Sequence, residues 1–156
     1  MIDRFRVVPA AYVFLLRPGS GSPGGDEVLL QLRQNTGYLD EHWAAAAAGH
    51  LERGETAYDA ARREAREEIG VELGDLGFVT SMQRTQHADM IDERIDFFFT
   101  SRSWTGEPRI VEPVKCGAMD WFALDALPEP VVPHELFVLQ RLGTGVESYT
   151  TFGFES

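Results

Sequence analysis

The sequence predicts one domain of the mixed α/β (α+β) class. Its 156 residues, 44% hydrophobic and 25% charged, suffice for one hydrophobic core and leave little room for a second. Short runs of β-branched and aromatic residues alternate with turn residues, which is the pattern of strands. A capped amphipathic segment in the middle of the chain has the period of a helix. We therefore expect a single domain over residues 1–156.

The first predicted elements are two strands joined by a long loop. Residues 7–16 (VVPAAYVFLL) favour a buried strand with its proline at the edge. A connection rich in Gly, Pro and Ser follows at 17–26, and a second strand is expected at 28–33, so we interpret the pair as a hairpin. In the polar loop at 34–41, the ring of Tyr38 is either a structural cover or a surface on which a ligand stacks.

Residues 43–49 (WAAAAAG) allow two interpretations. Alanine is the best helix former, which favours a short helix. The segment ends in glycine and directly precedes a second stretch punctuated by glycine, which favours an extended, closely packed segment. Both interpretations stay open at the level of sequence.

The clearest local signal is a helix between Thr56 and Gly70. Thr56 and Asp59 have the spacing of a capping box, and Gly70 suits a left-handed cap at the other end. At about 100° per residue, four side chains form one stripe that we expect to pack on a sheet. They are Tyr58, Ala61, Ala65 and Ile69.

A second face of this helix is acidic. Glu64, Glu67 and Glu68 stand at positions i, i+3 and i+4, so their carboxylates lie close together and repel one another. A solvated acidic face is one explanation. We favour a hard divalent cation such as Mg²⁺, because this face borders the buried stripe and Mg²⁺ takes oxygen ligands. Arg63 precedes Glu67 by four residues and is within reach of Glu55.

Further elements are predicted toward the C-terminus. Strands are expected at 76–84, 94–102 and 118–122, a helix from Pro133 to about residue 142, and a final strand or packed segment at 149–154.

Two features of this part of the chain have alternative explanations. The run of three phenylalanines at 97–99 fits a strand buried on both faces, and the alternative is a platform for a nucleotide base, with Phe99 as the candidate. In the turn before it, His87 and Asp89 are either solvated or in contact with a ligand.

The spacing of charged and glycine residues resembles a known motif. The box G-x5-E-x7-R-E-U-x-E-E-x-G-U, in which U is a bulky aliphatic residue, defines the Nudix (MutT-like) hydrolase superfamily. All fixed positions but one match it: Gly49, Glu55, Arg63, Glu64, Glu67, Glu68, Gly70 and Val71. The exception is Ala65, which is small where the family prefers leucine or a similar side chain.

The resemblance implies roles for the box residues. Three glutamates are expected to hold Mg²⁺, or Mn²⁺ in its place: Glu64, Glu67 and Glu68. The backbone carbonyl of Ala48 is expected to add a metal ligand, although many members have Gly or Pro-Gly where this chain has alanine at 45–48. Arg63 is expected to orient the carboxylates, pairing with Glu55.

Outside the box, the resemblance directs attention to the loop before the last core strand. Family members often place an additional carboxylate there, and Glu112 is our candidate, with Glu107 in reserve. The general base is then Glu67, Glu68 or Glu112. Lys115 is a candidate phosphate contact, and solvated surface is the alternative for it and for Glu112.

The segment at 121–128 (WFALDALP) with its Pro-led helix is similar to Nudix enzymes that clear oxidised purine nucleoside triphosphates. The mammalian member of that group grips the base with a Trp-Pro-acid-acid segment. This chain has Val132, Pro133, His134 and Glu135 there. His134 and Glu135 are therefore candidate substrate-binding residues, without an expectation of identical specificity.

The resemblance implies a mixed β-sheet sandwiched between helices and hydrolysis of a phosphoanhydride in a nucleoside diphosphate linked to another group. We expect a nucleoside triphosphate, oxidised or non-standard ones included, to be cleaved to the monophosphate and pyrophosphate. Alternatives are an ADP-ribose or nucleotide-sugar pyrophosphatase and a non-catalytic nucleotide-binding regulator. An isopentenyl diphosphate isomerase shares the fold but needs an early catalytic cysteine, whereas the only cysteine is Cys116, a packing residue by our interpretation.

Composition narrows the partners and the compartment. The net charge of -11 disfavours binding to a nucleic acid polymer, because no basic surplus is available to displace counterions. No apolar run approaches the roughly 20 residues that span a bilayer, and no signal peptide is recognisable, so a cytoplasmic protein is expected. A homodimer is a further expectation from the resemblance.

Overall fold

The computed structural model describes residues 3–20, 25–87 and 93–154. Asp89 lies outside this range. The described elements, in chain order, are β1 (Val8–Pro18), β2 (Asp26–Arg33), β3 (Trp43–Ala45), β4 (Ala47–His50), α1 (Ala57–Ile69), β5 (Glu72–Leu73), β6 (Gly77–Arg84), β7 (Arg94–Ser101), β8 (Trp104–Thr105), β9 (Cys116–Ala123), α2 (Pro133–Leu139) and β10 (Tyr149–Phe152).

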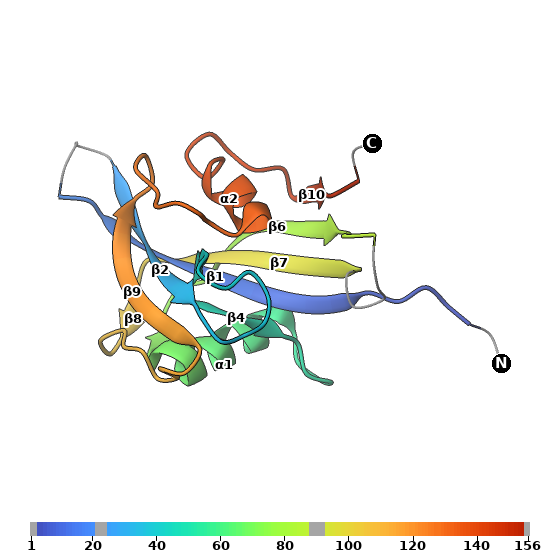
Figure 1. Cartoon of the computed structure of the whole chain (residues 1–156), viewed down its shortest axis with the longest axis horizontal. Coiled ribbons are helices and arrows are strands. Elements are labelled where there is room, and N and C mark those ends of the chain that lie inside the picture. Colours follow the sequence, from blue (N-terminus) through green and yellow to red (C-terminus); the bar gives the residue numbers. More distant parts are fainter. Residues whose placement is uncertain (1–2, 21–24, 88–92, 155–156) are drawn as a thin grey trace.

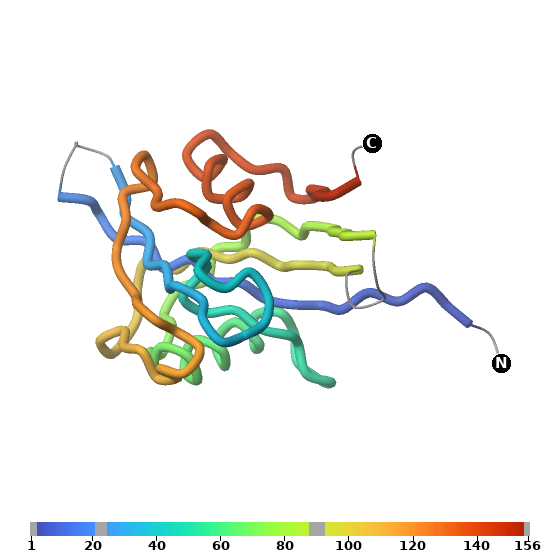
Figure 2. Tube along the Cα trace, viewed as in Figure 1, coloured from blue at the N-terminus to red at the C-terminus, as the bar shows by residue number. Residues whose placement is uncertain are grey.

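A mixed sheet forms the centre of the molecule, with α1 on one face and α2 on the other (Figure 1). The strand order is β10-β6-β7-β1-β2-β3, with β4 paired to β1 and β9 paired to β2. The pairs β1–β7 and β10–β6 are parallel, and the other pairs are antiparallel. Figure 2 shows β7 running beside β1 although the two are far apart in the sequence. The predicted sandwich and the β1–β2 hairpin are confirmed.

The two faces of the sheet bury different side chains, because neighbours along a strand point to opposite sides. Residues Ala11 and Val13 of β1 pack with α1, whereas Tyr12 and Phe14 pack on the side of α2. The phenylalanine run divides in the same way. Phe98 lies on the α2 side, and Phe99, only 1% exposed, lies on the α1 side, so the strand is buried on both faces as expected.

Helix α1 has the predicted ends. The Thr56 side chain accepts from the Asp59 backbone N–H, the Asp59 carboxylate accepts from the Thr56 N–H, and Gly70 closes the helix with φ 69°. The predicted stripe packs on the sheet, but its first member lies at the edge of the contact. The ring of Tyr58 packs against Phe99 of β7 with centroids 4.9 Å apart, yet Tyr58 is 49% exposed, and the fully buried Ala60 lies closer to the core.

Thr56→Ala tests the cap. We expect the free energy of unfolding to fall by about 1 kcal/mol, because the substitution leaves the Asp59 N–H without its acceptor. Urea denaturation of the two chains measures the difference. Thr56→Ser, which retains the hydroxyl, is the matched control, and equal losses in the two variants would contradict a role for the hydrogen bond.

The alanine run is extended rather than helical. β3 pairs with β2, and β4 pairs with β1, so both halves of the run are strands. Residues 44–47 are at most 3% exposed, which leaves room for no side chain larger than a methyl group without rearrangement. Backbone pairing with two central strands outweighs the helix propensity of alanine here.

Two smaller differences from prediction concern short elements. Helix α2 ends at Leu139 rather than near residue 142, and the chain continues in turns. The two-residue strands β5 and β8 pair with each other and were not predicted, because such short segments carry no periodicity. No helix in the described part of the chain is long and apolar enough to cross a membrane.

Candidate active site

The box residues meet where α1 packs against β4. The carboxylate of Glu64 fills the space beside Gly49, and a Cβ added at Gly49 would lie 2.3 Å from Glu64 Oε1. Glycine is therefore required at position 49 for the backbone of β4 to come so close to a buried carboxylate.

Arg63 is the centre of an ion-pair network. Its Nε and Nη2 atoms bind the two carboxylate oxygens of Glu55 at 2.6 and 3.0 Å, as expected from the sequence. Its Nη1 atom donates to Glu64 at 2.6 Å and to Glu67 at 3.2 Å. The hydrogen bonds from Arg63 lower the pKa of Glu55 to about 2. Arg63 thereby ties the loop before α1 to the acidic face of the helix.

Glu64 and Glu68 are desolvated carboxyl groups that interact with each other. Burial raises the pKa of both, and for Glu68 the charge of Glu64 raises it further, opposed by a hydrogen bond of 3.1 Å from the Ala48 N–H. Two such carboxylates repel one another when both are ionised, and a shared proton or cation relieves that repulsion.

This donor set fits a hard divalent cation. Glu64 and Glu68 provide neighbouring carboxylate oxygens, and Glu67, 54% exposed and paired with Arg63 at 3.2 Å, provides a third carboxylate on the same helix face. Within the residues that the structure describes, no three acidic, His or Cys side chains already converge as a complete metal site. We attribute this to Arg63, whose guanidinium draws Glu64 and Glu67 to itself.

The loop before β9 is fastened to the C-terminus of α1. The Arg109 N–H donates to the Ile69 carbonyl at 3.0 Å, and the Val111 N–H donates to the Glu68 carbonyl at 3.2 Å. The Arg109 guanidinium lies against Gly70, where a Cβ would be 2.4 Å from Arg109 Nη1. The negative end of the helix dipole favours a cation such as this guanidinium.

A second set of contacts fixes the other side of the same loop. The side-chain amides of Gln34 and Asn35 donate to the carbonyls of Pro113 and Val114 at 2.9–3.4 Å. As a result Glu112 and Lys115 line a small cavity of about 90 Å³ together with Glu68. Cys116 is 7% exposed at its wall, and burial raises the pKa of its thiol, in keeping with the predicted packing role.

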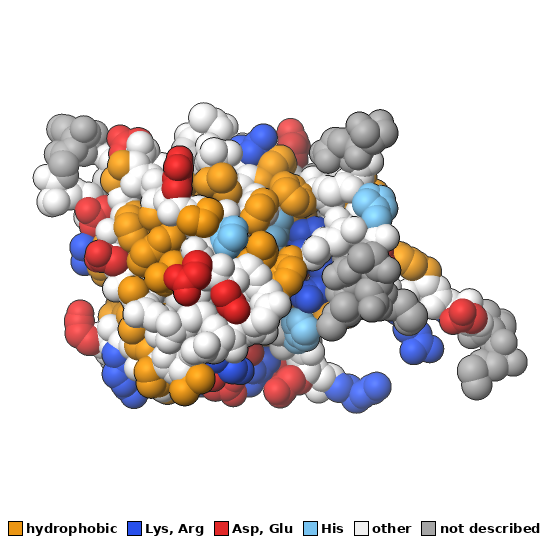
Figure 3. Space-filling view, viewed as in Figure 1, with side chains coloured by type: hydrophobic (Ala, Val, Ile, Leu, Met, Phe, Trp, Pro, Cys, Tyr) orange, Lys and Arg blue, Asp and Glu red, His pale blue; other side chains and the backbone are white. Residues whose placement is uncertain are grey.

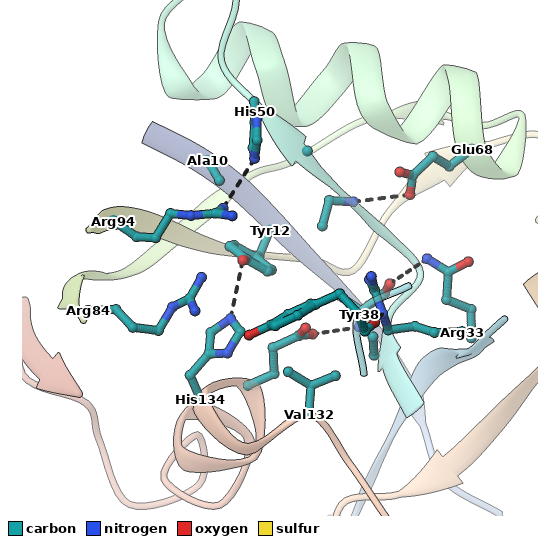
Figure 4. A pocket seen from close by; sticks show the side chains of 16 residues that line it. Ala10, Tyr12, Arg33, Tyr38, His50, Glu68, Arg84, Arg94, Val132 and His134 are labelled. Atoms are coloured by element: carbon teal, nitrogen blue, oxygen red, sulfur yellow. Dashed lines mark hydrogen bonds between the residues drawn. The ribbon is translucent and has the colours of Figure 1, made fainter. Parts of the chain in front are cut away.

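A larger cleft of about 190 Å³ opens on the other side of Glu68 (Figure 4). The residues that line it come from β1, β2, β3, β4, β6, β7, the end of α1, the start of α2 and the loop that holds Tyr38. Five of the residues predicted from the sequence are among them: Tyr38, Ala48, Glu68, His134 and Glu135.

Tyr38 has the predicted structural role, and its role as a stacking surface for a ligand stays a prediction. Its ring is 42% exposed, with the Arg33 guanidinium 5.9 Å from the ring centroid. Its hydroxyl accepts from Gln86 Nε2 at 2.6 Å, so it bridges the loop to the end of β6. The same side chain lines the cleft, in position for stacking.

His134 and Glu135 are buried at the base of the cleft. His134 Nε2 lies 3.2 Å from the Tyr12 hydroxyl, and Glu135 Oε1 accepts from the Ala45 N–H at 2.7 Å. Burial raises the pKa of Glu135 from 4.5 to about 7. A folded-state pKa above the ordinary value means that folding favours the protonated acid. The contribution of protonated Glu135 to the free energy of unfolding is fully present below about pH 4.5 and is lost as the pH rises through about 7.

Glu135→Gln tests this linkage. Glutamine keeps the acceptor for the Ala45 N–H but does not ionise. The free energy of unfolding of the variant, measured relative to that of the native chain, should therefore rise by about 1–3 kcal/mol between pH 5 and pH 8. Urea denaturation at the two pH values measures it, with the exposed Glu147→Gln as control. A difference independent of pH would contradict the raised pKa.

Two sequence candidates lie away from these cavities. Phe99 is buried in the core beneath α1, so it does not face the cleft, and its assignment as a substrate-binding residue was wrong. Glu107 is exposed and lines neither cavity. His87 binds the Gly153 carbonyl through Nε2 at 2.7 Å.

Several polar residues of the cleft were not predicted from the sequence. They are Tyr12, Gln31, Arg33, His50, Arg84 and Arg94. Arg84 and Arg94 were recognisable only as charged ends of apolar strands, and nothing local indicated that they share a cleft with Tyr12.

Comparisons with known proteins identify the family of the chain. A family model described as the NUDIX domain matches residues 7–142. A MutT NUDIX hydrolase from Burkholderia pseudomallei is similar in structure, with a TM-score of 0.71 and 25% identity over 86% of this chain and 98% of that one. A mutator MutT protein from Bacillus halodurans has a TM-score of 0.70 at 20% identity, covering 93% and 88% of the two chains.

The family match spans the box, both cavities and α2, which are the parts from which the site is built. The chain therefore belongs to the NUDIX family and is a Nudix-type hydrolase.

Proposed function

We propose that this hydrolase cleaves a nucleoside triphosphate to the monophosphate and pyrophosphate with the help of Mg²⁺, for which Mn²⁺ can substitute. Oxidised and other non-standard nucleotides are included in this class. The family acts on nucleoside diphosphates linked to a further group. In a nucleoside triphosphate that further group is a phosphate.

One observation carries the proposal. Glu68 lines both cavities, the cleft with Tyr38, His134 and Glu135 on one side and the small cavity with Glu112 and Lys115 on the other. A nucleoside in the cleft would direct its phosphate chain across Glu68 toward Lys115. The scissile bond would then lie beside the carboxylates.

The residues have distinct tasks in this proposal. Glu64, Glu67 and Glu68, with the Ala48 carbonyl, would hold the metal. The metal would neutralise phosphate charge and lower the pKa of a bound water. Arg63 orients the carboxylates through its bonds to Glu55, Glu64 and Glu67.

The remaining groups handle protons and the substrate. Glu67, Glu68 or Glu112 would accept the proton of the attacking water, and Lys115 would contact a phosphate. Tyr38 would stack on the nucleoside, and His134 and Glu135 would face its base.

Removal of the metal tests the proposed reaction. A panel of nucleoside triphosphates, 8-oxo-purine forms included, ADP-ribose and nucleotide sugars would be incubated with Mg²⁺, with Mn²⁺ and with EDTA, and products identified by chromatography. We expect monophosphate and pyrophosphate from a triphosphate with either metal and none with EDTA. Turnover confined to ADP-ribose or sugars would establish the alternative pyrophosphatase, and tight nucleotide binding without any turnover would establish the regulator.

A further inference from the structure

Glu112 lies in a turn that is held by hydrogen bonds more than by packing. The Lys115 N–H donates to the Glu112 carbonyl at 3.1 Å and closes this turn. The apolar side chains beside Glu112 provide little anchorage, because Val111 is 39% and Val114 is 69% exposed. Figure 3 shows hydrophobic side chains at the surface in this part of the molecule, at the lower left of the view. The position of the Glu112 carboxylate therefore depends on the polar contacts of the turn.

One side of the turn is bonded to helix α1. Val111, which directly precedes Glu112, donates its N–H to the Glu68 carbonyl at 3.2 Å. Glu112 and Glu68 accordingly line the same small cavity. Bonds on this side alone would leave the turn free to pivot about the end of the helix, so the contacts on its other side decide where the Glu112 carboxylate lies.

The other side of the turn is held by two consecutive residues, Gln34 and Asn35, which we call the amide clamp. Gln34 Nε2 donates to the Pro113 carbonyl at 3.0 Å. Asn35 Nδ2 donates to the Val114 carbonyl at 2.9 Å. The Gln34 backbone N–H donates to the Lys115 carbonyl at 3.0 Å. Three consecutive carbonyls of the turn are thus bound by the clamp.

Two special backbone positions make the clamp possible. Asn35 has φ 57°, in the left-handed region that most L-residues avoid and that asparagine tolerates better than most. Gly117 leaves room for the other amide, because a Cβ there would lie 2.7 Å from Gln34 Oε1. Neither clamp residue belongs to a hydrophobic core cluster, and Asn35 is exposed. Core packing therefore does not account for this arrangement, whereas placement of the turn does.

We propose that Gln34 and Asn35 are positioning residues, which hold the Glu112 carboxylate beside Glu68 at the metal end of the site. That Glu112 takes part in the reaction rests on the proposed function. The inference adds two residues outside the family motif that set the position of this carboxylate and, through the same turn, of Lys115.

Asn35→Gly separates positioning from stability. Glycine removes the amide but adopts a positive φ without strain, so the melting temperature should stay close to the native one. We expect kcat to fall about tenfold and KM to change less than about twofold, because the Glu112 carboxylate is misplaced while the nucleoside contacts remain. Initial rates with Mg²⁺ and the triphosphate that is cleaved fastest measure both constants.

Two further variants frame this comparison. Asn35→Asp tolerates the same backbone conformation but has no N–H to donate, so kcat should fall as in Asn35→Gly. It carries the test if the glycine variant does not fold. Glu41→Gly is the matched control, because Glu41 has φ 64° in the same loop, is exposed and lines neither cavity. This control relieves the same kind of backbone strain and should turn over as fast as the native chain.

Glu112→Gln shows whether the clamp acts through the carboxylate. In a double-mutant cycle, Asn35→Gly should change kcat less than about twofold in the Glu112→Gln background. A second cycle needs no turnover and uses calorimetry of Mn²⁺ binding to the free protein. Asn35→Gly should weaken Mn²⁺ binding about threefold, because a negative charge moves away from the metal, and should have no effect in the Glu112→Gln background.

Two results would overturn the inference. One is an equal loss of kcat from Asn35→Gly in the native and Glu112→Gln backgrounds, which would mean that the clamp does not act through Glu112. The other is native kcat and native Mn²⁺ affinity in both Asn35 variants. If no nucleotide is cleaved, the proposed reaction fails, and the Mn²⁺ cycle alone decides the inference. Weaker binding that depends on Glu112 supports the clamp, and any other result of that cycle overturns it.

Discussion

Glu67→Gln is expected to lower Mg²⁺-dependent turnover by about 10³-fold or more. The Glu67 side chain is 54% exposed, and its recorded ion pair is with Arg63 at 3.2 Å, so the substitution leaves packing intact. Glutamine has no charge to offer a divalent cation, and a catalytic metal contributes several kcal/mol to stabilising the charge of the transition state. The loss should appear in kcat rather than in the stability of the fold.

Glu72→Gln is a closely matched control. Glu72 is 55% exposed and paired with Arg66 at 3.0 Å, so it has the same residue type, exposure and kind of ion pair, away from both cavities. Initial rates against Mg²⁺ concentration for the native chain and both variants measure the effect, with urea denaturation to confirm equal stability. If Glu67→Gln turns over as fast as the native chain, Glu67 is not a ligand of the metal.

Gly49→Ala is expected to reduce turnover by about 100-fold, the second largest effect. The added Cβ would lie 2.3 Å from Glu64 Oε1 and 2.8 Å from Glu64 Oε2, so the carboxylate has to move. Moving the carboxylate breaks the hydrogen bond of 2.6 Å that Arg63 donates to Glu64. The same movement displaces one of the proposed metal ligands. Such a displacement in a close-packed site lowers the free energy of unfolding by about 1–3 kcal/mol. Misplacement of a catalytic group also lowers the turnover rate.

Gly143→Ala serves as the control, because a Cβ there would meet nothing within 4 Å. The measurements are turnover, the Mg²⁺ concentration at half-maximal rate and the free energy of unfolding. The prediction requires Gly49→Ala to raise the Mg²⁺ requirement. A variant that loses stability but keeps the native Mg²⁺ dependence would show that Glu64 does not contribute to the metal site.

Much of the fold was predictable because its signals are local. The helix caps at Thr56 and Gly70 involve neighbours within a few residues, and the helical spacing of Glu64, Glu67 and Glu68 follows from the geometry of α1 alone. The strands β1, β2, β6, β7 and β9 were expected within a few residues of their observed ends. The cytoplasmic location, the homodimer and the roles of individual site residues stay predictions.

Other features depend on contacts that local sequence does not encode. The alanine run fits a helix by propensity, and only its pairing with β1 and β2 makes it extended. Tyr58 lies on the predicted stripe and packs on Phe99, but only the tertiary contact decides that it stays 49% exposed while Ala60 is fully buried. Phe99 and Phe98 are adjacent in sequence and lie on opposite faces of the sheet.

The sequence by itself determined the candidate reaction centre, because the box residues come from the end of β4, the loop that follows and α1, which are consecutive in the chain. The tertiary structure decided what surrounds that centre. Arg84 and Arg94 became partners only through the register of β6 and β7, and Tyr12 joined them only through the pairing of β1 with β7. Register is set by long-range backbone hydrogen bonds and core packing, so no short stretch of sequence could have placed the cleft residues.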